Sequence, residues 1–185
     1  MNVVFTSRKT AYQPIPIPPG MTISIERYSR AAVGGCKTAT LQVQSQSRED
    51  LYELLNWLMA KAVIADDTGR PVWWGYLGKV EIQDGPMRAT ADLDWMANRV
   101  AVAYTTVAYG EETVGARATT AWLQDVISVE EFGLKELLYG RGGMTATLAE
   151  ALRARLLSQM AFPTAVFESN PGEDTIGATL TLRGW

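Results

Sequence analysis

The sequence predicts an α+β protein: an antiparallel β-barrel-like domain with one inserted helix, then a helix-rich segment closed by β-strands. Three observations predict this class. Apolar and polar residues alternate with period two through much of residues 21–109, as in antiparallel strands with one wet face. One stretch in that region has helical spacing instead. Beyond residue 110 helical patterns dominate until strands return at the end of the chain.

Three parts follow from these patterns. Residues 1–20 contain QPIPIPPG, whose prolines cannot donate backbone hydrogen bonds, and are predicted to form an extended N-terminal arm. An edge segment that crosses the domain surface is an equal alternative. Residues 21–109 form the barrel-like domain. Residues 110–185 form an α+β segment with two short helices, one longer helix and terminal strands.

The barrel-like domain begins with strands at Met21 and near Ala39. Ser47 is a good N-cap for a helix predicted over residues 48–61. The apolar stripe of this helix is Leu51, Leu54, Leu55, Leu58 and Ala62. A strand, a turn at Asp67-Thr68-Gly69 and a second strand follow. Two more alternating strands are predicted, one with Met87, Ala89, Ala91, Leu93 and Trp95 on one face and one with Val100, Val102 and Tyr104.

The segment beyond residue 110 carries helix caps. TTAWLQDVISVEEFGLKELLYGRGGM is predicted to form two short helices, the first capped by Thr120 and the second by Ser128 with Glu131. Three glycines, Gly140, Gly142 and Gly143, end the second helix. The longer helix starts at a capping box of Thr147 and Glu150, and its buried stripe is Leu148, Leu152, Leu156 and Met160. TAVFES and IGATLTLRGW are the closing strands.

Composition excludes several classes of function. The 185 residues are 47 % hydrophobic and 20 % charged, which are globular proportions, and the net charge is -3 without a basic block that would bind nucleic acid. The chain has no histidine, so it cannot build a Ser-His-Asp triad, a Cys-His pair or a histidine metal site alone. A single cysteine, Cys36, cannot form an internal disulfide.

The sequence shows no targeting signal. MNVVFTSRKT lacks the apolar core of a signal peptide. The longest apolar run, residues 54–65, is too short to span a bilayer and contains Lys61. We therefore expect a soluble protein that is made in a cytoplasm.

Motifs that resemble chemical sites have simpler explanations. GRGGMT, residues 140–145, precedes a helix and could hold an anion, but a connector between helices is favoured because the P-loop lysine is missing. Cys36 beside Lys37 is better explained as a packed cysteine. Turns and helix starts explain the acid pairs, which are Asp66-Asp67, Glu111-Glu112 and Glu130-Glu131. No catalytic, cofactor or metal residue is predicted, and the chain is not expected to be an enzyme.

Aromatic residues are more informative. In the strand over residues 72–82, Trp74 and Tyr76 fall on an apolar face that we assign to the core, whereas Trp73 and Leu77 fall on the other face. The helix or the N-terminal arm could cover Trp73, but a second subunit is favoured because other aromatics lie outside the predicted core. The candidate subunit interface is Trp73, Leu77, Trp57 and Trp185.

Three segments in order, GGCKTATLQVQ, PVWWGYLGKVEI and LDWMANRVAVAYT, resemble phage and prophage tail proteins of the baseplate-hub or tail-tip kind. The resemblance covers about residues 30–185 and rests on packing motifs. The matching positions are Trp73, Gly75, Leu77 and Val80, followed by Asp94, Asn98, Arg99, Val100, Val102 and Tyr104.

The resemblance implies a structural virion protein without catalytic residues. Proteins of this kind have barrel-like domains that assemble into a ring, commonly a trimer, which joins the tail tube to the tip around the DNA channel. Tube, tape-measure and baseplate or tip proteins would be its partners, and the tail of the virion its location. The chain is short for a full hub, so a hub split over several chains is also compatible.

Two other functions stay open. The alternative is a small-ligand or carbohydrate-binding β module in which Trp73, Tyr76 or Trp95 lines a cleft. An enzyme that relies on carboxylates alone would need two of them facing each other across a pocket.

Overall fold

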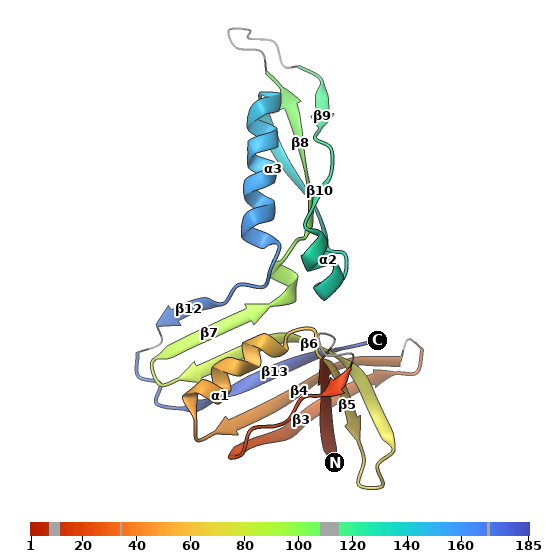
Figure 1. Cartoon of the computed structure of the whole chain (residues 1–185), viewed down its shortest axis with the longest axis vertical. Helices are drawn as coiled ribbons and strands as arrows, with labels where there is room; N and C mark the ends of the chain where they lie inside the picture. The colour runs from red at the N-terminus through yellow and green to blue at the C-terminus, as the bar shows by residue number, and fades with distance from the viewer. Residues whose placement is uncertain (8–11, 34, 108–114, 170) are drawn as a thin grey trace. The chain divides into compact units, whose positions relative to one another are not determined.

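The structure is a computed structural model that describes residues 1–7, 12–33, 35–107, 115–169 and 171–185. Two compact units make up the chain: unit 1 is Met1–Leu93 with Thr164–Trp185, and unit 2 is Asp94–Pro163. The predicted α+β class is confirmed, because unit 1 is a curled antiparallel half-barrel sheet with a helix and unit 2 holds a second sheet with helices (Figure 1). The boundary predicted between residues 109 and 110 lies outside the described residues, and the chain divides after Leu93 instead.

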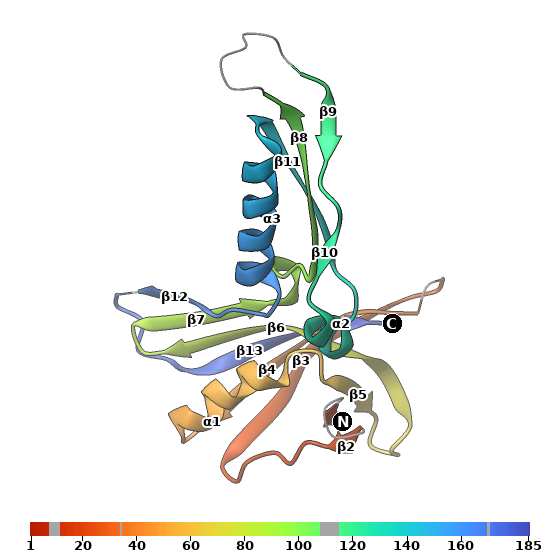
Figure 2. The same ribbon diagram turned by 45° about the horizontal axis from the view of Figure 1, so that its top comes forward.

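The sheet of unit 1 runs in the order β2-β1-β5-β6-β13-β4-β3, with β7 paired to β6 and β12 paired to β7 (Figure 2). These strands are β1 (Asn2–Ser7), β2 (Gln13–Pro14), β3 (Met21–Ala31), β4 (Gly35–Ser45), β5 (Lys61–Ala65), β6 (Pro71–Asp84), β7 (Met87–Asp92), β12 (Val166–Ser169) and β13 (Ile176–Gly184). The closing strands are predicted to join the helix-rich segment, but they belong to unit 1. β13 lies between β6 and β4, strands far earlier in the chain, and no local pattern reveals such a pairing.

The first residues of the chain are part of this sheet. β1 pairs antiparallel with β5, and β2 pairs with β1. Val3 and Phe5 are buried on one face of β1. Burial of alternate residues favours the edge-segment alternative over a free arm.

The predicted helix is shorter than residues 48–61. Ser47 is its N-cap, as predicted, and its side chain accepts a hydrogen bond from the backbone N–H of Asp50 over 3.3 Å. α1 covers Arg48–Glu53 and continues as a 3-10 turn over Leu54–Trp57. Met59 then takes a positive φ of 68°, and the chain turns into β5.

α1 packs against β4, β6 and β13 and defines the inner face of the sheet. The core of unit 1 lies between them. Its largest fully buried side chains are Phe5, Leu41, Val43, Leu51, Leu54, Ile64, Trp73, Leu77, Ile82, Leu93, Leu180 and Leu182.

A β-bulge at Gly78 reverses the faces of β6. Thr181 of β13 lies opposite Lys79, and the next residue, Leu182, lies opposite Leu77, so Gly78 is an extra residue on β6. An extra residue shifts the alternation by one and exchanges the two faces. Side chains at odd positions therefore point inward before Gly78, and side chains at even positions point inward after it.

The assignment of Trp74 to the core is therefore wrong. Trp73 is 0 % exposed on the inner face, and Trp74 is 40 % exposed on the outer face. Val80 and Ile82 do lie in the core, but their alternation does not continue unbroken to Trp74.

Unit 2 is built around β8 (Arg99–Thr106). β10 (Leu123–Gln124) and β9 (Arg117–Thr119) pair with it antiparallel, and β11 (Glu136–Met144) pairs with it in parallel. α3 (Ala146–Met160) packs on β8 and buries Ala149 and Leu157. No helix in the described part of the chain is long and apolar enough to cross a membrane.

Only one of the two predicted short helices forms. α2 covers Val126–Phe132 and is capped by Asp125, not by Ser128, whereas the segment predicted to start at Thr120 contains β10. The glycines of GRGGMT lie within β11, because parallel pairing with β8 overrides the local helical pattern.

α3 forms as predicted, but its cap and one stripe residue differ. Thr145, not Thr147, accepts the capping hydrogen bond from Leu148 N–H. The Leu148 side chain is 61 % exposed, because the helix is rotated so that Ala149 faces β8 instead.

Candidate functional site

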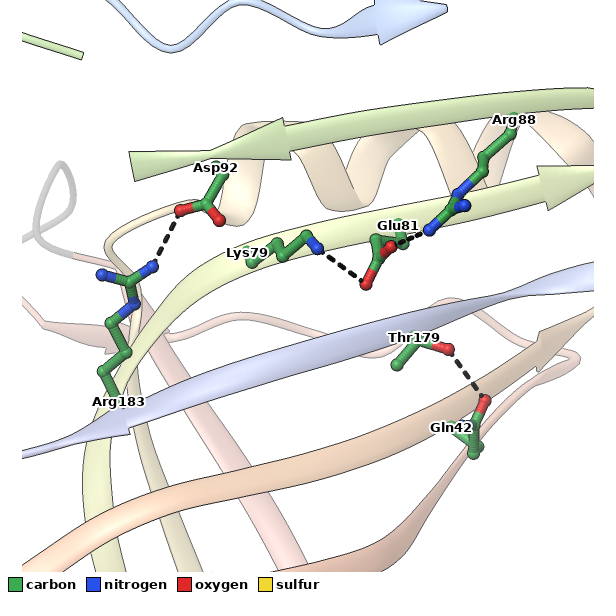
Figure 3. A network of polar contacts seen from close by, with 7 residues as sticks. All are labelled: Gln42, Lys79, Glu81, Arg88, Asp92, Thr179 and Arg183. Carbon is green, nitrogen blue, oxygen red and sulfur yellow. Dashed lines mark hydrogen bonds and ion pairs between the residues drawn. The ribbon is translucent and has the colours of Figure 1, made fainter. Parts of the chain in front are cut away.

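Polar side chains gather on the outer face of the sheet in unit 1, opposite α1. Cross-strand pairing aligns Gln42 of β4, Thr179 of β13, Glu81 of β6 and Thr90 of β7 in one row. Residues directly opposite on neighbouring strands have side chains close enough to interact. Figure 3 shows Glu81 between Lys79 and Arg88, and Arg183 reaching Asp92.

The charges around this row pair with one another. The Glu81 carboxylate lies 3.1 Å from Lys79 Nζ and also pairs with the guanidinium of Arg88. Arg183 Nη2 lies 2.8 Å from Asp92 Oδ1. Both carboxylates are therefore neutralised by cations of the same sheet, which suits a structural role better than a catalytic one.

Hydrogen bonds continue the network toward β3. Thr179 Oγ1 donates to Gln42 Oε1 over 3.1 Å, and Gln42 Nε2 donates to Glu26 Oε2 over 3.0 Å. Both polar atoms of the Gln42 amide are therefore engaged within the sheet.

The Glu81 carboxyl is shifted in the direction expected of an ion pair. Partial burial raises its pKa, but the hydrogen bonds from Arg88 and Lys79 together outweigh burial and hold the pKa below its ordinary value. A general acid that works near neutral pH needs a raised pKa. Glu81 therefore stays ionised and keeps its ion pairs with Lys79 and Arg88.

An open groove of about 550 Å³ lies on the same face. Gly177 contributes no side chain there, and long side chains such as Gln44, Gln83 and Arg88 stand at its walls. Gln83 Nε2 already donates to the carbonyl of Gly85 over 2.6 Å. The groove is a polar surface depression, and the amide side chains in its lining can form hydrogen bonds with a ligand.

The described residues hold no group of three or more His, Cys, Asp or Glu residues placed to bind a metal ion. Cys36 is buried, and its Sγ accepts a hydrogen bond from Trp74 N–H over 3.3 Å. Asp66 organises the turn, as its Oδ1 accepts from the N–H groups of Thr68 and Arg70, and the Thr68 hydroxyl is the main cause of its lowered pKa. Glu111-Glu112 lies outside the described residues.

Three of the four candidate interface residues are internal. Trp73 and Leu77 are fully buried, and Trp57 is buried with its ring 5.4 Å from that of Phe5. The chain's own inner face covers them, so the expectation that a second subunit covers Trp73 is wrong. Trp185 is different, with 60 % of its surface exposed.

Exposed apolar side chains gather at the other end of the outer face. Trp74 lies opposite Val63 of β5, which lies opposite Val4 of β1. Tyr76 is on the same face of β6, and its ring meets that of Trp185 edge-on, with centroids 6.1 Å apart. We call this surface the aromatic patch; it consists of Val4, Val63, Trp74, Tyr76 and Trp185.

Sequence reasoning missed most of the aromatic patch. The signal was Gly78 itself, because an isolated glycine inside a strand pattern often marks a bulge. A bulge at that position turns the Trp73 side chain inward and leaves the Trp74 side chain at the surface.

Asn98 is a second residue whose specific role sequence reasoning missed. Its side chain is buried in unit 2, where Oδ1 accepts from Lys135 N–H over 2.7 Å and Nδ2 donates to the Gly133 carbonyl over 2.7 Å and to Ser128 Oγ over 3.2 Å. Ser128 in turn donates to the Ala161 carbonyl. Asn98 joins the start of β8 to the segments around α2, so its role is structural.

Comparison with models of known protein families, with curated proteins and with solved structures finds no match to this chain.

Proposed function

We propose that this chain is a structural protein of a phage tail, a baseplate-hub or tail-tip component that assembles with copies of itself into a ring between tube and tip. One observation carries the proposal: the outer face of unit 1 leaves an aromatic patch open to solvent. An exposed cluster of apolar side chains beside polar neighbours is typical of a protein–protein interface.

Two further features support this function. The sheet is a curled half-barrel with β2 at one end of its order and β3 at the other, and open edges of this kind can be covered by neighbouring subunits. The positions that match the tail-protein pattern have packing roles, as Asn98 and Val100 show in unit 2. In the proposed ring the chain binds other tail proteins and catalyses no reaction.

The groove on the outer face favours a second candidate, a module that binds a small polar ligand. Trp73, one of the aromatic residues expected to line such a cleft, is buried and cannot do so. Gln44 and Gln83 would take its place as hydrogen-bonding groups. Gln44→Ala should then abolish ligand binding and leave the assembly state unchanged.

Electron microscopy of the purified chain, alone and with proteins encoded by neighbouring genes, tests the first proposal. We expect ring-shaped particles or a complex with a tube or tape-measure protein. A chain that stays monomeric at high concentration and binds none of these proteins would reject a tail function.

A further inference from the structure

The groove on the outer face of unit 1 lies where one row of side chains has a gap. Gly177 of β13 lies opposite Gln83 of β6, and Gln83 lies opposite Arg88 of β7. On the other side of Gly177 the next residue in the row is Gln44 of β4, as the register of β4 with β13 requires. The two glutamines are two strand spacings apart, about 10 Å, and the glycine between them leaves that space open.

Both walls of the groove have free hydrogen-bonding atoms. Gln44 is exposed, and its side-chain amide bonds to no other residue in the described part of the chain. Gln83 Nε2 donates to the Gly85 carbonyl, which fixes the orientation of the amide and leaves Oε1 as an acceptor. Arg88 pairs with Glu81 through one guanidinium nitrogen, and its other N–H groups are donors. One wall therefore offers an acceptor beside a donor, and the other wall offers an amide that is both.

The charges beside the groove balance. Glu81 lies between Lys79 and Arg88 (Figure 3), and Glu168 of β12 lies opposite Arg88. Two cations and two carboxylates have no net charge that would attract an ion. An anionic ligand would meet the carboxylate of Glu81 and Oε1 of Gln83, and a cationic ligand would meet the guanidinium of Arg88. A neutral ligand that both donates and accepts hydrogen bonds avoids both conflicts.

We propose that this groove binds one unit of a neutral carbohydrate through its hydroxyl groups. The inference rests on the proposed second function, a module for a small polar ligand, and names the class of that ligand. A hydroxyl donates and accepts, so one sugar hydroxyl can donate to Gln83 Oε1 while its neighbour accepts from Arg88. Gln44 can bond to a hydroxyl on the opposite side of the sugar ring.

The size and lining of the groove set the expected affinity. Its volume of about 550 Å³ lies within the range of small-ligand sites. The described residues that line it include no aromatic side chain on which a sugar ring could stack. Because hydrogen bonds alone hold the ligand, we expect a millimolar dissociation constant.

Saturation-transfer NMR of the full-length chain with four small probes tests the ligand class. Mannose and N-acetylglucosamine are the neutral probes, glucuronate is the anionic probe, and glucosamine is the cationic probe. The method observes the ligand, so it works on a monomer and on an assembly alike. A neutral sugar should bind, and both charged sugars should bind more weakly.

Matched glutamine variants test the place of binding. Gln44→Ala should abolish the signal at the sugar concentration that half-saturates the wild type. Gln83→Ala, which keeps the Gln44 amide, should weaken binding about fivefold. Gln124→Ala, at an exposed glutamine of β10 in unit 2, is the control and should bind as the wild type does. Circular dichroism and urea unfolding check that each variant is folded.

The outcomes separate the ligand class from the site. Neutral sugars that do not bind, or that bind wild type and Gln44→Ala equally well, would overturn the inference. If a charged probe binds best and Gln44→Ala abolishes its binding, the carbohydrate class is wrong while the polar-ligand function stands. If no probe depends on Gln44, that function is rejected as well. Sedimentation of the same samples tests the tail proposal separately, because none of these variants alters the aromatic patch.

Discussion

Gly78 decides which tryptophan faces the core and which faces solvent. The bulge there allows Leu77 and Val80 to point inward although they are an odd number of residues apart. The Arg183 side chain lies across Gly78, and a Cβ at that position would be 2.4 Å from Arg183 Nε. The same arginine pairs with Asp92, so the bulge and the polar network of the outer face depend on each other.

The first prediction compares the two tryptophans. Trp73→Ala should destabilise the chain by about 3–5 kcal/mol, the usual cost of removing a large buried side chain. Trp74→Ala should cost less than about 1 kcal/mol, as expected of a surface position. Urea unfolding monitored by circular dichroism measures both, under conditions in which the chain is monomeric. Equal losses for the two variants would contradict the bulge.

A second prediction concerns the close approach of strands at Gly75. A Cβ on this residue would lie 2.0 Å from the Arg183 carbonyl oxygen and 2.5 Å from Cη2 of Trp73. Because backbone must move to relieve this clash, Gly75→Ala should lower the unfolding midpoint strongly. Gly140→Ala in β11 is the control, since a Cβ added there would have no atom outside its own chain neighbours within 4 Å. Similar midpoints for the two variants would show that the strands do not approach so closely.

A third prediction follows from the lowered pKa of Glu81. Its carboxylate contributes stability that is present above its ordinary pKa and is lost as the pH falls through the lowered folded-state value. The wild type should therefore lose more unfolding free energy than Glu81→Gln when the pH falls from 7 to below about 4. Urea titrations at the two pH values measure the difference. An equal loss in both proteins would mean that Glu81 does not contribute.

At the scale of elements, the buried side-chain amide of Asn98 stabilises unit 2. It forms hydrogen bonds with the backbone N–H of Lys135 and the carbonyl of Gly133, and it connects β8 to α2 through Ser128. Asn98→Ala should therefore destabilise unit 2 by at least about 2 kcal/mol, because a buried polar group without a partner costs about 1–3 kcal/mol. Hydrogen exchange should show earlier opening of β8 and β11. Asn56→Ala, at an exposed amide in unit 1, should leave exchange in unit 2 unchanged.

Elements were predictable where the signal is local. Period-two alternation located β3, β4 and β8, and the Ser47 cap located the start of α1. The predictions fail where pairing with a distant strand overrides the local preference of a segment for helix. β11 forms in a segment with helical spacing because it pairs in parallel with β8, and α1 ends early because Lys61 enters β5.

The candidate site could be predicted only in part, for a similar reason. The sequence indicates that one of the two adjacent tryptophans lies outside the core, which is correct, but it assigns Trp74 to the core and Trp73 to the other face, whereas the structure has them the other way round. Only the pairing of β13 with β6 reveals the extra residue at Gly78. The aromatic patch also needs β1 beside β5, a contact between segments that no composition or periodicity brings together.

For the whole molecule, a polar surface whose charges pair with one another contrasts with an apolar surface that is open to solvent. The ion pairs around Glu81 are complete within unit 1. The aromatic patch is exposed, and burying it would lower the free energy in proportion to the apolar area removed from water. This contrast is the reason why we propose assembly through the aromatic patch.

Sedimentation velocity of the full-length wild type and of Trp74→Glu, over a rising concentration series, tests most directly whether the aromatic patch drives assembly. We expect the wild type to form assemblies larger than a dimer and Trp74→Glu to remain a folded monomer over the same range. A wild type that stays monomeric at every concentration, or a Trp74→Glu chain that assembles as the wild type does, would contradict this role of the patch.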